Sequence, residues 1–280
     1  LVPEILQLDE ATIQSFIDSN NDLKRYEFDL KLINEKRPHI LDANTEKLLT
    51  EAQDALSTPS NVYGMFSNAD LEFEDAIDKD GQAYPLTQGT FIKYLESDDR
   101  ELRASAFRNV YKAYGAHNNT LGATLAGEVK KNVFNARTHH YRSARERALS
   151  NNHIPEAVYD NLIKTVHKYL PLLHRYTKLR QELLGLDDLK MYDLYTPLVK
   201  DVKFEMPYEE AKSWMLKALE PMGEEYLNVV KKGLDNRWVD VYENKGKRSG
   251  GYSSGGHLTN PFILLNWSDT VSDLYTLVDR

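Results

Sequence analysis

Hydrophobic residues recur along most of the chain at spacings of three and four, which is typical of helices that bury one face. Between residues 99 and 118, for example, Leu102, Ala106 and Val110 fall on one side of a helical projection. The same periodicity predicts helices over residues 9–19, 21–34, 45–56, 99–118, 120–138, 155–185, 207–219 and 224–233, and a last one that begins at Ser268 or Asp269. Pro171 should kink the helix over residues 155–185, because proline cannot donate an interior hydrogen bond.

Alternating and β-branched segments are fewer and lie mainly in the last third. Residues 71–86 alternate around Asp80-Gly81, a strong turn signal, and predict a hairpin. Strands are predicted over residues 189–199, 238–242 and 262–267. The fold class expected is therefore mainly α, with helical lobes and a small β-sheet near the C-terminal end.

The stretch GKRSGGYSSGG, residues 246–256, interrupts these patterns and resembles two chemical motifs. The stretch does not match the phosphate-binding P-loop motif, because Val241 occupies the position of its first glycine and Arg248 the position that requires Ser or Thr. The segment Gly251–Gly255 matches the serine-nucleophile pattern G-x-S-x-G, but the residues before it are polar rather than a buried strand. Both catalytic interpretations are therefore disfavoured.

Backbone exposure remains as the explanation of this stretch. Gly250 and Gly251 remove side chains beside Tyr252, between two predicted strands. Small residues at a sheet edge allow an extended peptide to pair through main-chain hydrogen bonds. A plain flexible loop is the alternative, and spacing alone leaves both open.

The amino-acid composition excludes several kinds of chemistry and several classes of partner. The chain has no cysteine, which excludes disulfides, thiol catalysis and thiolate metal sites and fits a cytoplasmic protein. The net charge of -8, with basic residues scattered among acidic ones, argues against a nucleic-acid partner or an anionic membrane. No apolar run approaches the roughly 20 residues that span a bilayer.

The histidines do not have the spacing of a helical metal site. His167 and His174 are seven residues apart with Pro171 between them, and His139 and His140 are adjacent. Ligand pairs on a helix must lie three or four residues apart to reach one ion. These side chains are interpreted as surface or supporting groups. Acidic pairs such as Asp98-Asp99 are interpreted as helix caps.

Several multi-residue motifs, in order, resemble the oligoendopeptidase F family of zinc metallopeptidases, which is related to thimet oligopeptidase. They are LVPEIL at the start, SDDR with the following Ala-Phe-Arg helix, RSA at residues 142–144, YDLYTPL at residues 192–198, and NKGKRSGGYSSG followed by NPFILLNW and DLYTLV. The similarity extends over essentially all 280 residues.

The resemblance implies a two-lobed helical enzyme whose closed channel admits short peptides. In that family, zinc is held by a helical H-E-x-x-H motif and a downstream glutamate. The resemblance implies a helical N-terminal region over residues 1–68 and the first part of the catalytic domain over residues 69–280. It also makes Gly250, Gly251 and Tyr252 the candidate substrate-binding residues.

The end of the chain departs from the family pattern. After T-L-V the family continues with His-Glu, whereas this chain has Asp279-Arg280, so no catalytic residue and no metal ligand can be assigned and the zincin-type fold is incomplete. The chain also starts without Met. We therefore expect a portion of a zinc oligopeptidase, inactive alone, that supplies channel wall and a peptide-aligning strand. The alternative is a truncated product that binds peptides or is purely structural.

Overall fold

The structure is a computed structural model that describes residues 2–199 and 205–280. The chain divides into two compact units, the first formed by Leu1–Tyr63 and Asn119–Leu170 and the second by Gly64–Asn118 and Pro171–Arg280. The predicted boundary at residues 68/69 separates an N-terminal region from a catalytic domain along the chain, whereas each compact unit combines two segments of the chain. The boundary at 68/69 stays a prediction.

The first unit consists of helices and the loops that join them, with no strand among its described residues. It contains α1 (Val2–Ile5), α2 (Glu10–Ser19), α3 (Asn21–Lys24), α4 (Glu27–Glu35), η1 (Arg37–His39), α5 (Ala43–Leu56), most of α6 (Thr58–Met65), α9 (Asn118–Thr138), α10 (Ala144–Ser150) and the first half of α11 (Glu156–Leu183). Short polar side chains begin several of these helices: Asp9 accepts from the backbone N–H of Thr12, and Asp42 from those of Asn44 and Thr45.

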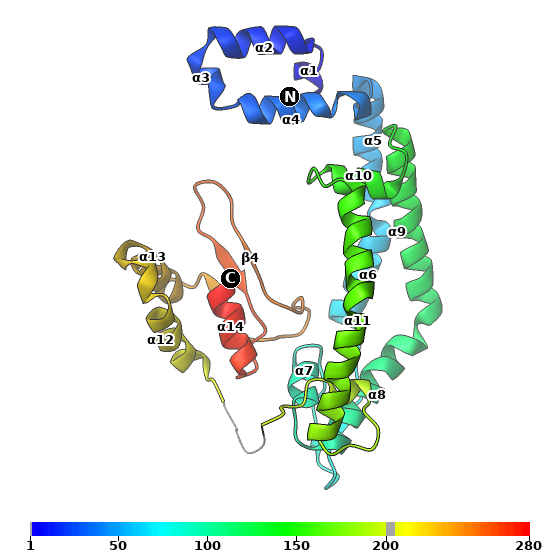
Figure 1. The fold of residues 1–280 in the computed structure, drawn as a ribbon, viewed down its shortest axis with the longest axis vertical. Coiled ribbons are helices and arrows are strands. Elements are labelled where there is room, and N and C mark those ends of the chain that lie inside the picture. The colour runs from blue at the N-terminus through cyan, green and yellow to red at the C-terminus, as the bar shows by residue number, and fades with distance from the viewer. Residues whose placement is uncertain (1, 200–204) are drawn as a thin grey trace. The chain divides into compact units, whose positions relative to one another are not determined.

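The second unit combines helices with two small sheets, and its α-helices are labelled in Figure 1. It contains η2 (Phe66–Asp70), β1 (Ala76–Ile77), β2 (Ala83–Tyr84), α7 (Thr90–Leu95), α8 (Arg100–Ala116), the rest of α11, η3 (Met191–Asp193), α12 (Tyr208–Ala218), η4 (Glu220–Met222), α13 (Glu224–Asp235), β3 (Val239–Asp240), β4 (Tyr252–Ser254), β5 (Phe262–Leu264) and α14 (Val271–Asp279). The mainly helical fold class with a small sheet near the C-terminal end is confirmed.

Two hydrophobic clusters support this unit. The first joins α8 to the β1–β2 hairpin through Ala76, Leu102 and Ala106. The second lies between α12, the inner face of the C-terminal sheet and α14, and its buried members are Met206, Tyr208, Ala211, Met215, Leu265, Trp267 and Leu277. The indole Nε1 of buried Trp267 donates to the carbonyl of Met206 at 3.0 Å, so this core satisfies its polar atom internally.

Several predicted elements are confirmed. The hairpin turns at Asp80-Gly81, where Gly81 has φ +82°, and Asp99 caps α8 by accepting from the N–H groups of Glu101 and Leu102. The helix over residues 155–185 forms as α11, which runs through Pro171 as one element. Its apolar stripe is exposed, and Arg180 is its buried residue.

Three predictions were wrong in detail. Residues 189–199 form no strand, because Asp193 is drawn into a buried ion-pair network and the backbone turns through η3. The helix over residues 21–34 is interrupted between α3 and α4. The last helix is capped by Thr270 rather than by Ser268 or Asp269, because Thr270 and Asp273 form a reciprocal capping box.

Candidate functional site

The C-terminal sheet of the second unit places the glycine-rich stretch at its edge. Its strand order is β3-β5-β4, with β3 parallel and β4 antiparallel to β5. Figure 1 shows β4 and its neighbouring loops beside α14. Tyr252, Ser253 and Ser254 pair with Leu264, Ile263 and Phe262 respectively. The structure thus forms a strand over Tyr252–Ser254 and none over residues 246–251 before it, and peptide pairing on this edge stays a prediction.

The register determines which backbone groups of β4 face away from the sheet. Ile263 donates its N–H to Trp238 on the β3 side, at 2.8 Å, so the pair Ser253–Ile263 is not hydrogen-bonded. The N–H and C=O of Ser253 therefore point outward, and those of Tyr252 and Ser254 point toward β5. Among the described residues, the outward groups of Ser253 have no partner.

Gly250 and Gly251 enter this strand for two different physical reasons. Gly250 has φ +86°, a conformation that glycine adopts without strain. Gly251 lies against α14, where a Cβ atom would come 2.9 Å from Cγ2 of Thr276. The structure brings both glycines directly before Tyr252, a residue that is 41% exposed. Their role in substrate binding stays a prediction.

Tyr252 belongs to the face of the sheet that does not pack on α12 and α14. On this face Phe262 is more than half exposed, and a hollow of about 750 Å³ lies over the strands. Residues from β3, β4 and β5 line it together. An extended chain on the outer edge of β4 would place alternate side chains beside this apolar face.

The base of the loop before β4 is tied to the helical part of the same unit by Glu243. Its carboxylate accepts from the Thr87 hydroxyl at 2.8 Å and from the Gly89 N–H at 3.3 Å. A Cβ atom on Gly89 would lie 2.9 Å from this carboxylate, so a larger residue there would displace the Glu243 side chain. A second hollow, of about 520 Å³, lies between this loop and residues 67–88.

The described residues do not fit a zinc site. No group of three or more His, Asp or Glu side chains in residues 2–199 and 205–280 is arranged to hold a metal ion. His257, downstream of β4, is exposed, and Asp279 at the end of α14 lies 3.8 Å from the cationic Nε of Arg280. We therefore derive no catalytic step through zinc from this chain.

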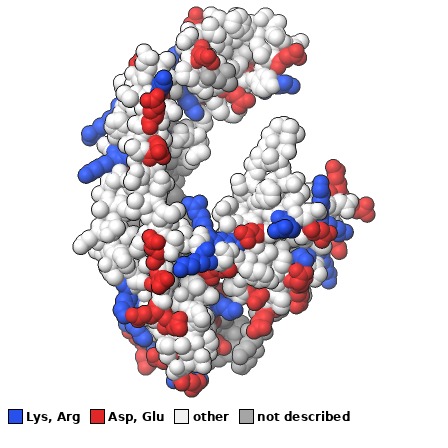
Figure 2. Space-filling view, turned by 180° about the vertical axis from the view of Figure 1, so that it is seen from behind, with Lys and Arg blue, Asp and Glu red and all other residues white. Residues whose placement is uncertain are grey.

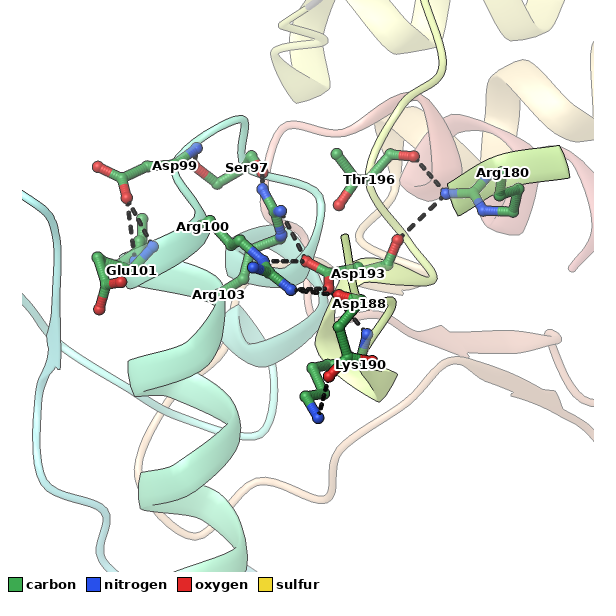
Figure 3. A network of polar contacts seen from close by, with 11 residues as sticks. Ser97, Asp99, Arg100, Glu101, Arg103, Arg180, Asp188, Lys190, Asp193 and Thr196 are labelled. Carbon is green, nitrogen blue, oxygen red and sulfur yellow. Dashed lines mark hydrogen bonds and ion pairs between the residues drawn. The ribbon is translucent and has the colours of Figure 1, made fainter. Parts of the chain in front are cut away.

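A buried ion-pair network was not predicted from the sequence. Asp193 is fully buried and accepts from Nη2 of Arg103 at 2.8 Å and Nη2 of Arg100 at 2.9 Å (Figure 3). Both arginines come from α8, and Figure 3 shows Arg180 of α11 approaching from the opposite side, where it donates to the carbonyls of Asp193 and Thr196.

The electrostatics of this network favour a charged Asp193. Burial by itself would raise the pKa of this carboxyl, but hydrogen bonds from Arg100 and Arg103 outweigh burial, and the pKa is lowered. The spacing of Arg100 and Arg103 on one helix face is the sequence signal for this site, and the YDLYTPL motif contains its partner. The network fixes residues 186–199 against α8 and α11.

The surface carries charges of both signs. On the face shown in Figure 2, lysine and arginine side chains are interspersed with aspartate and glutamate rather than collected by sign. None of the helices within the described residues combines the length and the apolar character needed to cross a membrane.

Comparisons with known proteins cover the whole chain. Residues 93–279 match the model of peptidase family M3, and residues 4–73 match that of oligopeptidase F. Oligopeptidase PepF of Bacillus subtilis is 54% identical over 99% of this chain and 42% of the relative. Group B oligopeptidase PepB of Streptococcus agalactiae is 46% identical, over 99% of this chain and 46% of the relative.

A solved structure agrees with these matches. Oligoendopeptidase-F from Enterococcus faecium superposes with a TM-score of 0.68 at 40% identity, over 84% of this chain and 44% of that one. The chain therefore spans less than half the length of the curated relatives that it matches.

Proposed function

Since the chain belongs to peptidase family M3, we propose that it is a portion of a zinc-dependent oligopeptidase and supplies the strand that aligns short peptides. Family membership implies peptidase activity for the complete enzymes. The observation that carries the proposal is the free outer edge of β4, which presents the N–H and C=O of Ser253. An extended peptide satisfies such groups by adding a strand, without requiring a particular sequence.

The zinc of the complete enzyme is implied by the family, and the described residues offer no ligand set for it. We therefore expect the chain alone to bind short peptides without hydrolysing them, as a wall of the peptide channel. Chelator-sensitive hydrolysis of a quenched fluorescent peptide by the purified chain would contradict this expectation.

Replacing Ser253 by proline tests strand addition directly. Proline lacks the outward N–H, whereas the ladder to β5 uses Tyr252 and Ser254 and remains available. We expect Ser253→Pro to weaken binding of a fluorescently labelled hexapeptide by about tenfold, the effect of losing one well-formed hydrogen bond plus the clash of the ring. Fluorescence anisotropy titration measures the dissociation constant.

Ser253→Ala is the matched control, because it removes the hydroxyl and keeps the backbone N–H. Its affinity should equal that of the parent. A second arm uses a hexapeptide that is N-methylated at every backbone amide, which should bind more weakly than the unmethylated peptide, because no N–H then remains to pair with the Ser253 carbonyl. Equal affinities for Ser253→Pro and the parent would exclude pairing on this edge.

A further inference from the structure

The loop that leads into β4 is held from β3 by a buried lysine. The Lys247 side chain is 4% exposed, and its Nζ lies 3.0 Å from Oδ1 of Asp240. The same ammonium donates to the carbonyl of Asp240 at 3.2 Å and to that of Tyr242 at 2.6 Å. An ammonium has three donors, so all three are used on the end of β3.

A second side chain holds the loop from the end of β5. The register pairs Tyr252 with Leu264, and two residues further along the ladder Gly250 lies opposite Asn266. There the Asn266 side chain donates from Nδ2 to the carbonyls of Gly250 at 2.8 Å and Arg248 at 3.0 Å. The side-chain amide thus extends the β4–β5 ladder beyond its last backbone pair.

These contacts determine the phase of the strand. With the Gly250 carbonyl turned toward β5, alternation turns the backbone groups of Gly251 and Ser253 outward. A slip of one residue would turn Tyr252 and Ser254 outward and direct the Ser253 groups into the sheet. In a strand of three residues, Tyr252–Ser254, the backbone ladder alone contributes few hydrogen bonds against such a slip.

We propose that Lys247 and Asn266 are positioning residues that fix the register of residues 248–254, so that Gly251 and Ser253 present their backbone groups to a peptide. The role in peptide binding rests on the proposed function of β4. The role in fixing the loop does not, and the two are tested by separate measurements.

Trypsin cleavage after exposed Arg248 reports the order of the loop in the intact chain. We expect Lys247→Met and Asn266→Asp each to accelerate cleavage of the Arg248–Ser249 bond by about tenfold. Each variant lacks the hydrogen bonds of the replaced side chain, so the loop opens locally at a lower cost in free energy. Mass spectrometry follows this bond separately from cleavage at other sites. Lys247→Arg, which keeps a cationic donor, should restore most of the protection.

Lys245→Met is the matched control from the same loop. Lys245 is exposed and has no hydrogen bond or ion pair within the described part of the chain. The variant Lys245→Met should therefore be cleaved after Arg248 at the same rate as the parent. Far-UV circular dichroism should be unchanged in all variants. Cleavage of both Lys247→Met and Asn266→Asp at the rate of Lys245→Met would overturn the proposal.

Peptide titration then separates the two proposals. If the parent binds the labelled hexapeptide, Lys247→Met and Asn266→Asp should bind it about tenfold more weakly. Unchanged affinity despite fast cleavage would overturn the link between register and binding. If the parent binds no peptide, the proposed function of β4 fails, and the trypsin rates alone still decide whether Lys247 and Asn266 hold the loop.

Discussion

Two largely irregular loops of the second unit, residues 186–199 and 243–251, are each held by one buried charge, but the charges have opposite sign. Asp193 accepts from two guanidinium groups and from the N–H of Lys190. Lys247 donates to one carboxylate and two backbone carbonyls. The aspartate is therefore balanced by two full charges from α8, and the lysine by one largely exposed carboxylate together with two peptide dipoles of the strand beside it.

This difference predicts unequal consequences of mutation. Removing the aspartate leaves Arg103, itself 3% exposed, without its anionic partner. Removing the lysine leaves carbonyls, one of which already accepts from the N–H of Leu265, and a carboxylate on Asp240 that is largely exposed. The first loop should thus affect global stability, and the second mainly local order.

The largest effect is expected for Asp193→Asn, which keeps the shape and removes the charge. We expect the free energy of unfolding to fall by about 3 kcal/mol, because a buried guanidinium then lacks its counterion. Urea unfolding followed by circular dichroism measures it. Asp188→Asn is the control, since its ion pair with Lys190 is exposed and its loss should change stability by less than about 0.5 kcal/mol. Similar losses of stability in the two variants would mean that the buried ion pair of Asp193 contributes no more than the exposed one of Asp188.

The second prediction concerns pH. The pKa of Asp193 lies below the usual 3.8 in the folded chain, so its contribution is complete above pH 3.8 and is lost as pH falls through the folded value. The difference in unfolding free energy between the parent and Asp193→Asn should therefore be constant near neutral pH and shrink on acidification below 3.8. A difference that persists unchanged in strong acid would show that the ionised form of Asp193 is not what makes the parent more stable than Asp193→Asn.

The smallest effect is expected at Gly251, where the second loop enters β4. Gly251→Ala should cost about 1 kcal/mol, because the new Cβ meets Cγ2 of Thr276. Thr276→Ser removes that methyl group and retains a hydroxyl for the Ser272 carbonyl. In a double-mutant cycle the two substitutions should couple favourably by about 0.5 kcal/mol or more. Additive effects would mean that α14 does not constrain Gly251.

The sequence predicts the helices well because they depend on local spacing and caps. Asp99 as an N-cap, the Asp80-Gly81 turn and the long helix α11 all follow from residues close together in the chain. The segment over residues 189–199 could not be predicted in this way. Its β-like composition is overridden by Asp193, whose partner Arg103 lies 90 residues away.

The candidate site likewise has features that the sequence predicts and features that it does not. Glycines between two strands predict a segment with an accessible backbone, and β4 forms there. The sequence does not show that Gly251 faces Thr276 or that Asn266 lies opposite Gly250, because both contacts depend on the register and on the packing of α14. The outward direction of the Ser253 backbone follows only once that register is known.

The shortness of β4 has a consequence for self-association. An unpaired strand edge is a template on which a second copy of a protein can assemble into an aggregate. At about 3.3 Å per residue, three residues offer an edge of about 10 Å. Such an edge matches a short segment of a passing peptide, and the glycines on either side, poor strand formers, do not lengthen it enough for fibril growth. The shortness of β4 thus favours transient binding of a peptide over lasting assembly with a second copy of the protein.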